Sequence, residues 1–217
     1  MRVLSLYACG LHGADGQSGL GLLLNNQTPP TALIAPVSGW IVRWSHLLPP
    51  NATVLDVACG AGRHIQWFSD RGHRVTGVDR DLTQAQQNLP RGATLVFADM
   101  EGSPWPLTTD GRPTLFDAVV VTNYLWRTLM PTVIHSLAPG GVLLYETFAA
   151  GNETVGRPAR PDFLLQPGEL LSYCRDLHVV AYEHGYLEDP PRFVQRIAAT
   201  SMRAMPGEAT APALHLL

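Results

Sequence analysis

The sequence predicts an α/β fold, a mostly parallel sheet with helices on both of its faces. Short apolar runs typical of strands alternate with helical patterns through the middle of the chain, and this alternation is typical of parallel strands joined by crossover helices. One strand candidate contains an unbroken run of three valines at 119–121, as expected of a strand buried on both faces. The composition, 46% hydrophobic and 15% charged over 217 residues, suits one globular domain with a full core.

The expected elements follow one another in a regular order. Ser38 can cap a first helix whose apolar side includes Trp40, Ile41, Trp44 and Leu47, and two prolines at 49 and 50 end it. The expected strands cover residues 53–58, 74–79, 94–98, 116–122, 141–147, 177–184 and 192–199. The expected helices between them cover residues 63–71, 83–89, 128–137 and 167–174.

Both ends of the chain differ from this pattern. Residues 1–35 are rich in glycine and show no sustained period, which favours a loosely ordered N-terminal extension. Residues 204–217, with Pro206, Gly207 and Pro212, favour a flexible C-terminal tail. The domain itself is expected over residues 36–203.

The net charge and the cysteines indicate which kinds of partner the protein has and in which cellular compartment it works. The formal net charge of −3 gives no electrostatic case for a nucleic-acid partner. Cys9, Cys59 and Cys174 lack metal-ligand spacing and are odd in number, so neither a zinc site nor a disulfide framework is expected. No apolar run reaches the ~18–20 residues of a membrane span, and the apolar stretch after Arg2 is shorter than the core of a signal peptide. A cytoplasmic protein without a membrane partner is therefore expected.

The strongest functional signal is a Gly-x-Gly turn between a strand and a helix. Asp56 interrupts the apolar strand, and Gly60 and Gly62 follow it just before the helix begins. Glycine lets the backbone approach a ligand closely, and the N–H groups of such a turn face that ligand. Asp79 ends the next strand, nineteen residues after Gly60, where an acidic residue of a Rossmann unit takes ribose hydroxyls.

A further landmark, Asp99 and Met100, directly follows the third strand. In combination, these motifs resemble the class I S-adenosylmethionine-dependent methyltransferases, over roughly residues 40–200. The resemblance implies a Rossmann-like methyltransferase fold with seven strands in the order 3-2-1-4-5-7-6, the seventh antiparallel. It also implies a cofactor, S-adenosyl-L-methionine, that lies across the carboxyl ends of the first strands.

The resemblance assigns each motif residue a role toward this cofactor. Asp56 orients the glycine loop, or the cofactor ammonium through water, and Asp79 takes the ribose hydroxyls. The remaining contacts fall to Gly60 and Gly62 beside the methionine part, Asp99 at the adenine amino group and the Met100 backbone near it.

A narrower resemblance concerns the segments 121–127, 145–148 and 163–170, which look like small bacterial methyltransferases of the tellurite-resistance type. Asn123 and Tyr124 follow the fourth strand, at the edge where ligands of such sheets bind, and are expected near the transferred methyl group. Glu146 ends the fifth strand and is the expected general base, if the reaction uses one. These three residues are the catalytic candidates.

Other residues near this edge are open between a structural and a functional role. Trp126 and Arg127 follow the catalytic pair, and His64 either caps its helix or faces the pocket. The segment 149–168, rich in Gly and Pro, is longer than the ~2–6 residues usual between elements of an α/β unit. It is expected to be a substrate-covering loop, with Arg157 as its contact for an anion.

The function expected from these observations is methyl transfer to a small-molecule acceptor by in-line displacement. Two other functions stay open: a cofactor-binding module without catalysis, and a nicotinamide-dependent oxidoreductase. The second predicts a third glycine in Gly-x-Gly-x-x-Gly, but Ile65 occupies that position. A DNA methyltransferase would want Asp/Asn-Pro-Pro-aromatic or a Pro-Cys pair after the fourth strand, and neither is present there.

Overall fold

The computed structural model describes residues 35–202 of the chain. Apart from residue 35, the expected N-terminal extension over 1–35 lies outside the described residues, and so does the expected tail over 204–217.

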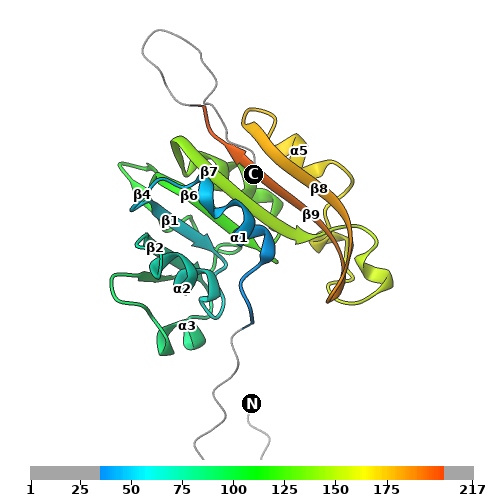
Figure 1. Ribbon diagram of the computed structural model, residues 1–217, viewed down its shortest axis with the longest axis horizontal. Coiled ribbons are helices and arrows are strands. Elements are labelled where there is room, and N and C mark those ends of the chain that lie inside the picture. Colours follow the sequence, from blue (N-terminus) through cyan, green and yellow to red (C-terminus); the bar gives the residue numbers. More distant parts are fainter. Residues whose placement is uncertain (1–34, 203–217) are drawn as a thin grey trace, which may run out of the picture. The chain divides into compact units, whose positions relative to one another are not determined.

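One seven-stranded sheet organises the described residues (Figure 1). Its strands, in chain order, are β1 (Thr53–Val57), β2 (Arg74–Asp79), β3 (Thr94–Phe97), β6 (Phe116–Thr122), β7 (Leu137–Phe148), β8 (His178–Glu188) and β9 (Pro191–Thr200). Their spatial order is β3-β2-β1-β6-β7-β9-β8, and β9 runs antiparallel to both of its neighbours. Numbered along the chain, this is the predicted order 3-2-1-4-5-7-6 with an antiparallel seventh strand, and the prediction is confirmed.

Helices cover both faces of this sheet, as predicted. On one face α1 (Gly39–Trp44) and α2 (Arg63–Ser69) contribute apolar residues to a core that includes Val54 and Val120, and Leu82, just before α3 (Thr83–Gln87), joins it. On the other face α4 (Met130–His135) and α5 (Glu169–Tyr173) contribute to a core that includes Leu55 and Val121. Neighbouring residues of one strand thus enter opposite cores, because successive side chains of a strand point to opposite faces.

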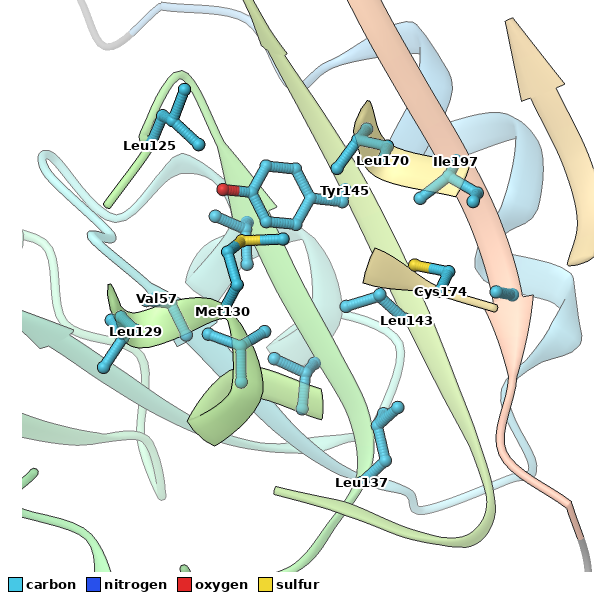
Figure 2. Packing of buried hydrophobic residues seen from close by; sticks show 14 of the residues in the cluster. Val57, Leu125, Leu129, Met130, Leu137, Leu143, Tyr145, Leu170, Cys174 and Ile197 are labelled. Carbon is cyan, nitrogen blue, oxygen red and sulfur yellow. The ribbon is translucent and has the colours of Figure 1, made fainter. Parts of the chain in front are cut away.

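The second of these cores surrounds Tyr145, a residue of β7 (Figure 2). Its ring lies near Met130 and Leu170, which come from α4 and α5, and its hydroxyl points toward Leu125. That hydroxyl donates a 2.7 Å hydrogen bond to the carbonyl of Tyr124. A buried Tyr usually pairs its hydroxyl in this way, and here the pairing ties the loop after β6 to the neighbouring strand.

Short 3₁₀ turns and a hairpin complete the fold. The turns are η1 (Ser45–Leu47), η2 (Arg127–Leu129), η3 (Asn152–Thr154) and η4 (Pro161–Phe163), and the hairpin joins β4 (Thr108–Thr109) to β5 (Arg112–Pro113). The sequence analysis did not predict this hairpin. It also predicted one helix over 128–137, where the chain forms η2, then α4, and then enters β7 at Leu137. Pro131 lacks an N–H group, so it fits only the first turn of α4, and the α-helix begins just before it.

The parallel strands β1, β2, β3, β6 and β7 all end at one edge of the sheet, and the antiparallel strand β9 begins at that edge. In the pairing of β7 with β9, Phe148 at the end of one strand faces Val194 near the start of the other. The hairpin between β8 and β9 therefore reaches the same edge as the glycine loop and the loop after β6. The candidate site is built at this edge.

Candidate functional site

The chain turns sharply where it leaves the sheet at the ends of β1 and β6. Ala58 and Asn123 have φ values of 55° at these two points, in a region that residues other than glycine enter infrequently. Asn123 is fixed there by its backbone N–H, which donates a 2.9 Å hydrogen bond to the carbonyl of Glu146. Such backbone conformations in residues with side chains persist where the surroundings impose them, and they cluster at functional sites.

The glycine loop follows Ala58 and is tied to the next strand. Gly60 and Gly62 both have positive φ values, 53° and 81°, which explains the glycines at these positions. The N–H of Gly60 donates a 2.8 Å hydrogen bond to Asp79 Oδ2, and Asp79 Oδ1 accepts a 2.9 Å bond from the N–H of Asp81. Asp79 therefore shapes the loop, a role that the sequence analysis did not assign to it.

A first cavity of about 250 Å³ lies beside this loop. It contains five of the predicted site residues, Asp79, Asp99, Met100, Asn123 and Tyr124, together with Ala58, Arg80, Ala98 and Glu101. The residues come from the carboxyl ends of β1, β2, β3 and β6, where open α/β sheets bind nucleotide-like ligands. Asp99 is oriented by its own loop, because its Oδ1 accepts backbone hydrogen bonds from Glu101 and Gly102 at 3.1 and 3.2 Å.

Asp56 lies beneath the loop, fully buried within β1. Neither of its carboxyl oxygens has a hydrogen-bond partner among the described residues. Burial raises the pKa of this carboxyl from 3.8 to about 8, although the charge of Arg63 opposes the shift. Burying an ionised carboxylate without a partner is costly, so Asp56 is protonated at neutral pH unless a cation pairs with it.

His64 is a buried neighbour of Asp56. Its Nδ1 lies 3.9 Å from Asp56 Oδ1, too far for a hydrogen bond. Burial and the charge of Arg63 lower the pKa of His64 to about 3, so the ring is neutral and the pair is not a salt bridge. Nε2 of His64 accepts a 3.4 Å hydrogen bond from the N–H of Ser38. His64 therefore holds the segment that precedes α1.

Tyr124 contributes a phenol that is half-buried and has no hydrogen-bond partner among the described residues. Burial and the nearby carboxylates Glu101 and Asp99 raise the pKa of this phenol well above its usual value. The hydroxyl therefore keeps its proton at neutral pH. It can therefore donate a hydrogen bond but does not act as a base at that pH.

A second cavity of about 490 Å³ shares Asn123 with the first, as a residue that lines both. Arg63, Arg157 and Arg192 reach it from α2, the loop after β7 and the start of β9. Glu146 lies in its wall, buried, and accepts hydrogen bonds from Ser38 Oγ at 3.1 Å and from Arg196 Nη1 at 3.3 Å.

The segment 149–168 borders this cavity and is anchored at several points. Two backbone hydrogen bonds join its ends: the N–H of Ala150 donates to the carbonyl of Leu165, and the N–H of Leu165 donates to the carbonyl of Phe148. The buried side chain of Asn152 donates to the carbonyl of Pro158 at 2.9 Å and accepts from the N–H of Phe193 at 3.1 Å.

Arg127 supplies another anchor. It forms a two-pronged ion pair with Glu169, with distances of 2.7 and 3.0 Å, and also donates to the carbonyls of Asp162 and Leu164. Arg127 is thus a structural residue that tethers the loop. Trp126 packs against the core around Tyr145 and is not among the residues that line the two cavities.

The structure brings most of the predicted residues together and adds several that the sequence analysis missed. Asp79, Asp99, Met100, Asn123, Tyr124 and Glu146 line one or both cavities, whereas Asp56 lies beneath the glycine loop and Gly60 and Gly62 form it. The missed residues are Ser38, Arg63 and Arg192. Arg63 directly follows Gly62, so a charged residue at the helix start was available as a signal. Nothing in the sequence placed Ser38 against Glu146.

The edge of the sheet, the glycine loop and the acidic residues after β2 and β3 define an α/β domain built to hold a nucleoside-containing cofactor. A family model described as "Methyltransferase domain" matches residues 54–141. The match and the fold resemble the class I S-adenosylmethionine-dependent methyltransferase superfamily, whose cofactor is S-adenosyl-L-methionine, as predicted.

Individual relatives agree with this assignment. The putative methyltransferase YqeM of Bacillus subtilis is 28% identical over 128 residues, which make up 54% of this chain and 50% of the relative. Trans-aconitate 2-methyltransferase of Delftia acidovorans is 28% identical over 150 residues, 63% of this chain and 55% of the relative. The chain thus spans about half the length of the curated relatives that it matches.

Solved structures share the fold. TehB from Haemophilus influenzae superposes with a TM-score of 0.58 at 21% identity, over 76% of this chain and 62% of that one. Within residues 35–202, no helix has the length and apolar character needed to cross a bilayer.

Proposed function

We propose that the protein transfers the methyl group of S-adenosyl-L-methionine to a small-molecule acceptor. The observation that carries this proposal is the position of Asn123, which lies between two cavities. The first contains the acidic residues expected to hold a nucleoside, and the second is a separate space lined by charged side chains. A methyl transferase needs a donor site and an acceptor site that meet at the reacting carbon.

When bound, the cofactor would supply a methyl group activated by a sulfonium. The lone pair of the acceptor would bind the methyl carbon, and the electron pair of the broken carbon–sulfur bond would stay on sulfur. The protein supplies orientation and electrostatics. Asp79 and Asp99 hold the ribose and the adenine in the first cavity, beside Met100, and the glycine loop borders the methionine part. Asp56 beneath that loop is the acid that can pair with the ammonium group.

Two residues are proposed to act on the acceptor, Tyr124 from the first cavity beside Asn123 and Glu146 from the second. Tyr124 donates a hydrogen bond, since its phenol keeps its proton. Glu146 is the carboxylate in the wall of the second cavity and is the candidate base for an acceptor that must lose a proton. An acceptor that is already an anion needs no base, and Glu146 then serves to hold Ser38 and Arg196 in place.

A small acceptor fits the site better than a nucleic acid does. A volume of about 490 Å³ lies within the ~300–1,000 Å³ of typical small-molecule pockets. The net charge of −3 disfavours the phosphate backbone of RNA or DNA, whose binding relies on basic surfaces. Among the relatives, the enzyme from Delftia acidovorans is named for a small acceptor, trans-aconitate. Cys59 and Cys174 are buried free thiols, which suits the proposed cytoplasmic location.

Calorimetry with the full chain tests the proposal. S-adenosylmethionine and S-adenosylhomocysteine should bind, and NADH should not. A screen of small acceptors with methyl-labelled cofactor should then release S-adenosylhomocysteine. Binding of NADH together with neither sulfur compound would refute the proposal. Tight cofactor binding without turnover on any acceptor class, nucleic acids included, would favour the non-catalytic binding module.

A further inference from the structure

The second cavity holds three arginines and lies at the point where four separate segments of the chain meet. Arg63 begins α2, Arg157 lies in the loop after β7 and Arg192 lies at the start of β9. The fourth segment, residues 35–39, closes another side of the cavity. No single element explains this gathering of guanidinium groups, because the three come from positions far apart in the sequence.

The charges of these arginines are only partly neutralised by the protein. Arg63 donates to two uncharged oxygens, the Pro36 carbonyl at 2.9 Å and Thr122 Oγ1 at 3.3 Å. Within residues 35–202, neither Arg63 nor Arg157 has a carboxylate within the 4.0 Å of an ion pair. The charge of Arg192 is partly compensated by Glu146, because its Nη2 lies 3.9 Å from Glu146 Oε1.

Two carboxylates also line the cavity, and both must be counted. Glu146 is buried and pairs with Arg196, whose Nη1 lies 3.3 Å from its Oε2, but Arg196 also pairs with Glu183. Asp189 is exposed to solvent in the turn between β8 and β9, where water screens its charge. With Arg196 and Glu183 included, four arginines face three carboxylates, Glu146, Glu183 and the exposed Asp189, and the cavity carries a net positive charge.

Partial burial of the arginines strengthens the attraction of the cavity for an anion. Arg63 is half-buried, and electrostatic attraction strengthens as water is excluded. A guanidinium binds carboxylates and other oxyanions with two parallel hydrogen bonds. The volume of about 490 Å³ exceeds what an inorganic anion fills and suits an organic acid of several carbons.

We infer that this cavity binds the methyl acceptor and that the acceptor is an organic oxyanion, a carboxylate held by Arg63 and Arg157 beside Arg192. The inference rests on the proposed function, since it identifies the second cavity as the acceptor site. The bound carboxylate lies on the far side of Asn123 from the cofactor cavity. Another part of the acceptor then reaches toward Asn123 and Tyr124.

Anion binding to the full chain saturated with S-adenosylhomocysteine tests the inference. The probes are malonate as a dicarboxylate, malonamide as its uncharged counterpart and inorganic phosphate as an inorganic oxyanion. Malonate should bind, malonamide should not, and phosphate should bind more weakly than malonate. The Arg157→Gln variant should lose about tenfold in malonate affinity, as expected for one charge-assisted hydrogen bond, and Arg63→Gln should lose at least as much.

Arg160→Gln is the matched control. Arg160 lies in the same loop, three residues from Arg157, but pairs with Asp162 in solvent and is not among the residues that line the cavity. Its replacement should change malonate affinity less than twofold. Arg157 is exposed and has no hydrogen-bond partner within residues 35–202, so Arg157→Gln should keep the thermal midpoint and the S-adenosylhomocysteine affinity of the unmodified protein.

The outcomes separate this inference from the proposed function. Failure of S-adenosylhomocysteine to bind would defeat the proposed function itself. Normal S-adenosylhomocysteine binding with no malonate binding would overturn the inference alone, as would equal losses in Arg157→Gln and Arg160→Gln. Phosphate binding as tight as that of malonate would replace the organic acid with an inorganic oxyanion.

Discussion

At the scale of the single residue, the site combines groups whose protonation is set by burial with groups whose charge is exposed to ligand. Asp56 and His64 are both buried side by side, and burial drives both toward their neutral forms. The arginines of the second cavity keep their charge. The interior beneath the glycine loop is thus close to neutral, and the charge that ligands meet lies at the edge of the sheet.

The pH dependence of stability should reveal the state of Asp56. Its folded pKa of about 8 exceeds its unfolded value of 3.8, so the folded state holds a proton that the unfolded state has released. The stabilising contribution is complete below pH 3.8 and is lost as the pH rises through 8. His64, with its pKa lowered from 6.5 to about 3, acts in the opposite sense, but only below pH 6.5.

Denaturant unfolding without cofactor between pH 6.5 and 8.5 therefore isolates Asp56 from His64. The free energy of unfolding should fall with rising pH, by at most about 1.4 kcal/mol per pH unit. Asp56→Asn stays uncharged and should flatten this slope. An equal slope in the variant would show that another group titrates.

Asp79 combines two tasks, and its removal should weaken cofactor binding. Asp79→Ala removes the acceptor of the Gly60 N–H as well as the proposed acceptor for the ribose hydroxyls, and each charged bond of this kind contributes about 1.5–3 kcal/mol. The dissociation constant for S-adenosylhomocysteine should rise at least tenfold, as measured by calorimetry, while the cooperative thermal transition persists. An unchanged dissociation constant in a folded variant would remove Asp79 from the cofactor site.

At the scale of the element, Arg127 makes a segment without regular strands or α-helix into a defined wall. Arg127→Ala leaves Glu169 without its two-pronged partner and frees two loop carbonyls. The free energy of unfolding should fall by about 1–3 kcal/mol, and limited proteolysis should cut faster between residues 153 and 160.

The Arg160→Ala variant is the control for this prediction. The side chains of Arg160 and Asp162, which form an ion pair, are 73% and 70% exposed. Exposed ion pairs contribute little to stability. The variant should change the unfolding free energy by less than about 0.5 kcal/mol. A loss as large as that of Arg127→Ala would mean that any charge change in this loop is destabilising.

The strands were predicted from the sequence more accurately than the helices or the site. The bounds of β2 and β6 match the expected 74–79 and 116–122, and in β6 a continuous apolar run marks a strand buried on both faces. Helices proved shorter, as with α2, which ends at Ser69 rather than at residue 71. The fifth strand, expected over 141–147, begins earlier, because β7 starts at Leu137 and runs through Pro139 and the two glycines after it.

The residues proposed to hold the cofactor could be placed at this edge of the sheet from the sequence, because they stand at the ends of their strands or just after them. The cavity arginines could not, since Arg192 reaches the site only through the antiparallel direction of β9. Direction and pairing of the last two strands arise from contacts far apart in the chain. Local pattern alone does not encode them.

At the scale of the whole molecule, the beginning of the described residues belongs to the site. Pro36 accepts a hydrogen bond from Arg63, and Ser38 both caps α1 and donates to Glu146. We therefore propose that the domain begins at about residue 36, as the sequence analysis predicted. The residues needed for folding and for the second cavity should therefore begin close to residue 36.

Two truncated chains test this boundary. A chain beginning at residue 35 should fold and bind S-adenosylhomocysteine with the affinity of the full chain, because it keeps every contact of Pro36 and Ser38. A chain beginning at residue 40 lacks the cap of α1, worth about 1 kcal/mol, and one side of the second cavity. Its thermal midpoint should fall and its malonate binding should vanish. Equal behaviour of the two chains would place the boundary later in the domain.

The anchors of the segment 149–168 have a consequence for how such a protein can change over generations. The two ends of the segment are fixed by backbone bonds, by Asn152 and by Arg127, whereas residues 153–157 at its apex are exposed to solvent. The side chains of Glu153 and Thr154 bond to the backbone of Gly151, but substitution of Arg157, which lines the second cavity, alters the wall that a ligand meets without touching these bonds. The apex is therefore a place where new acceptor preferences can evolve, or be selected in a library, at little cost in stability.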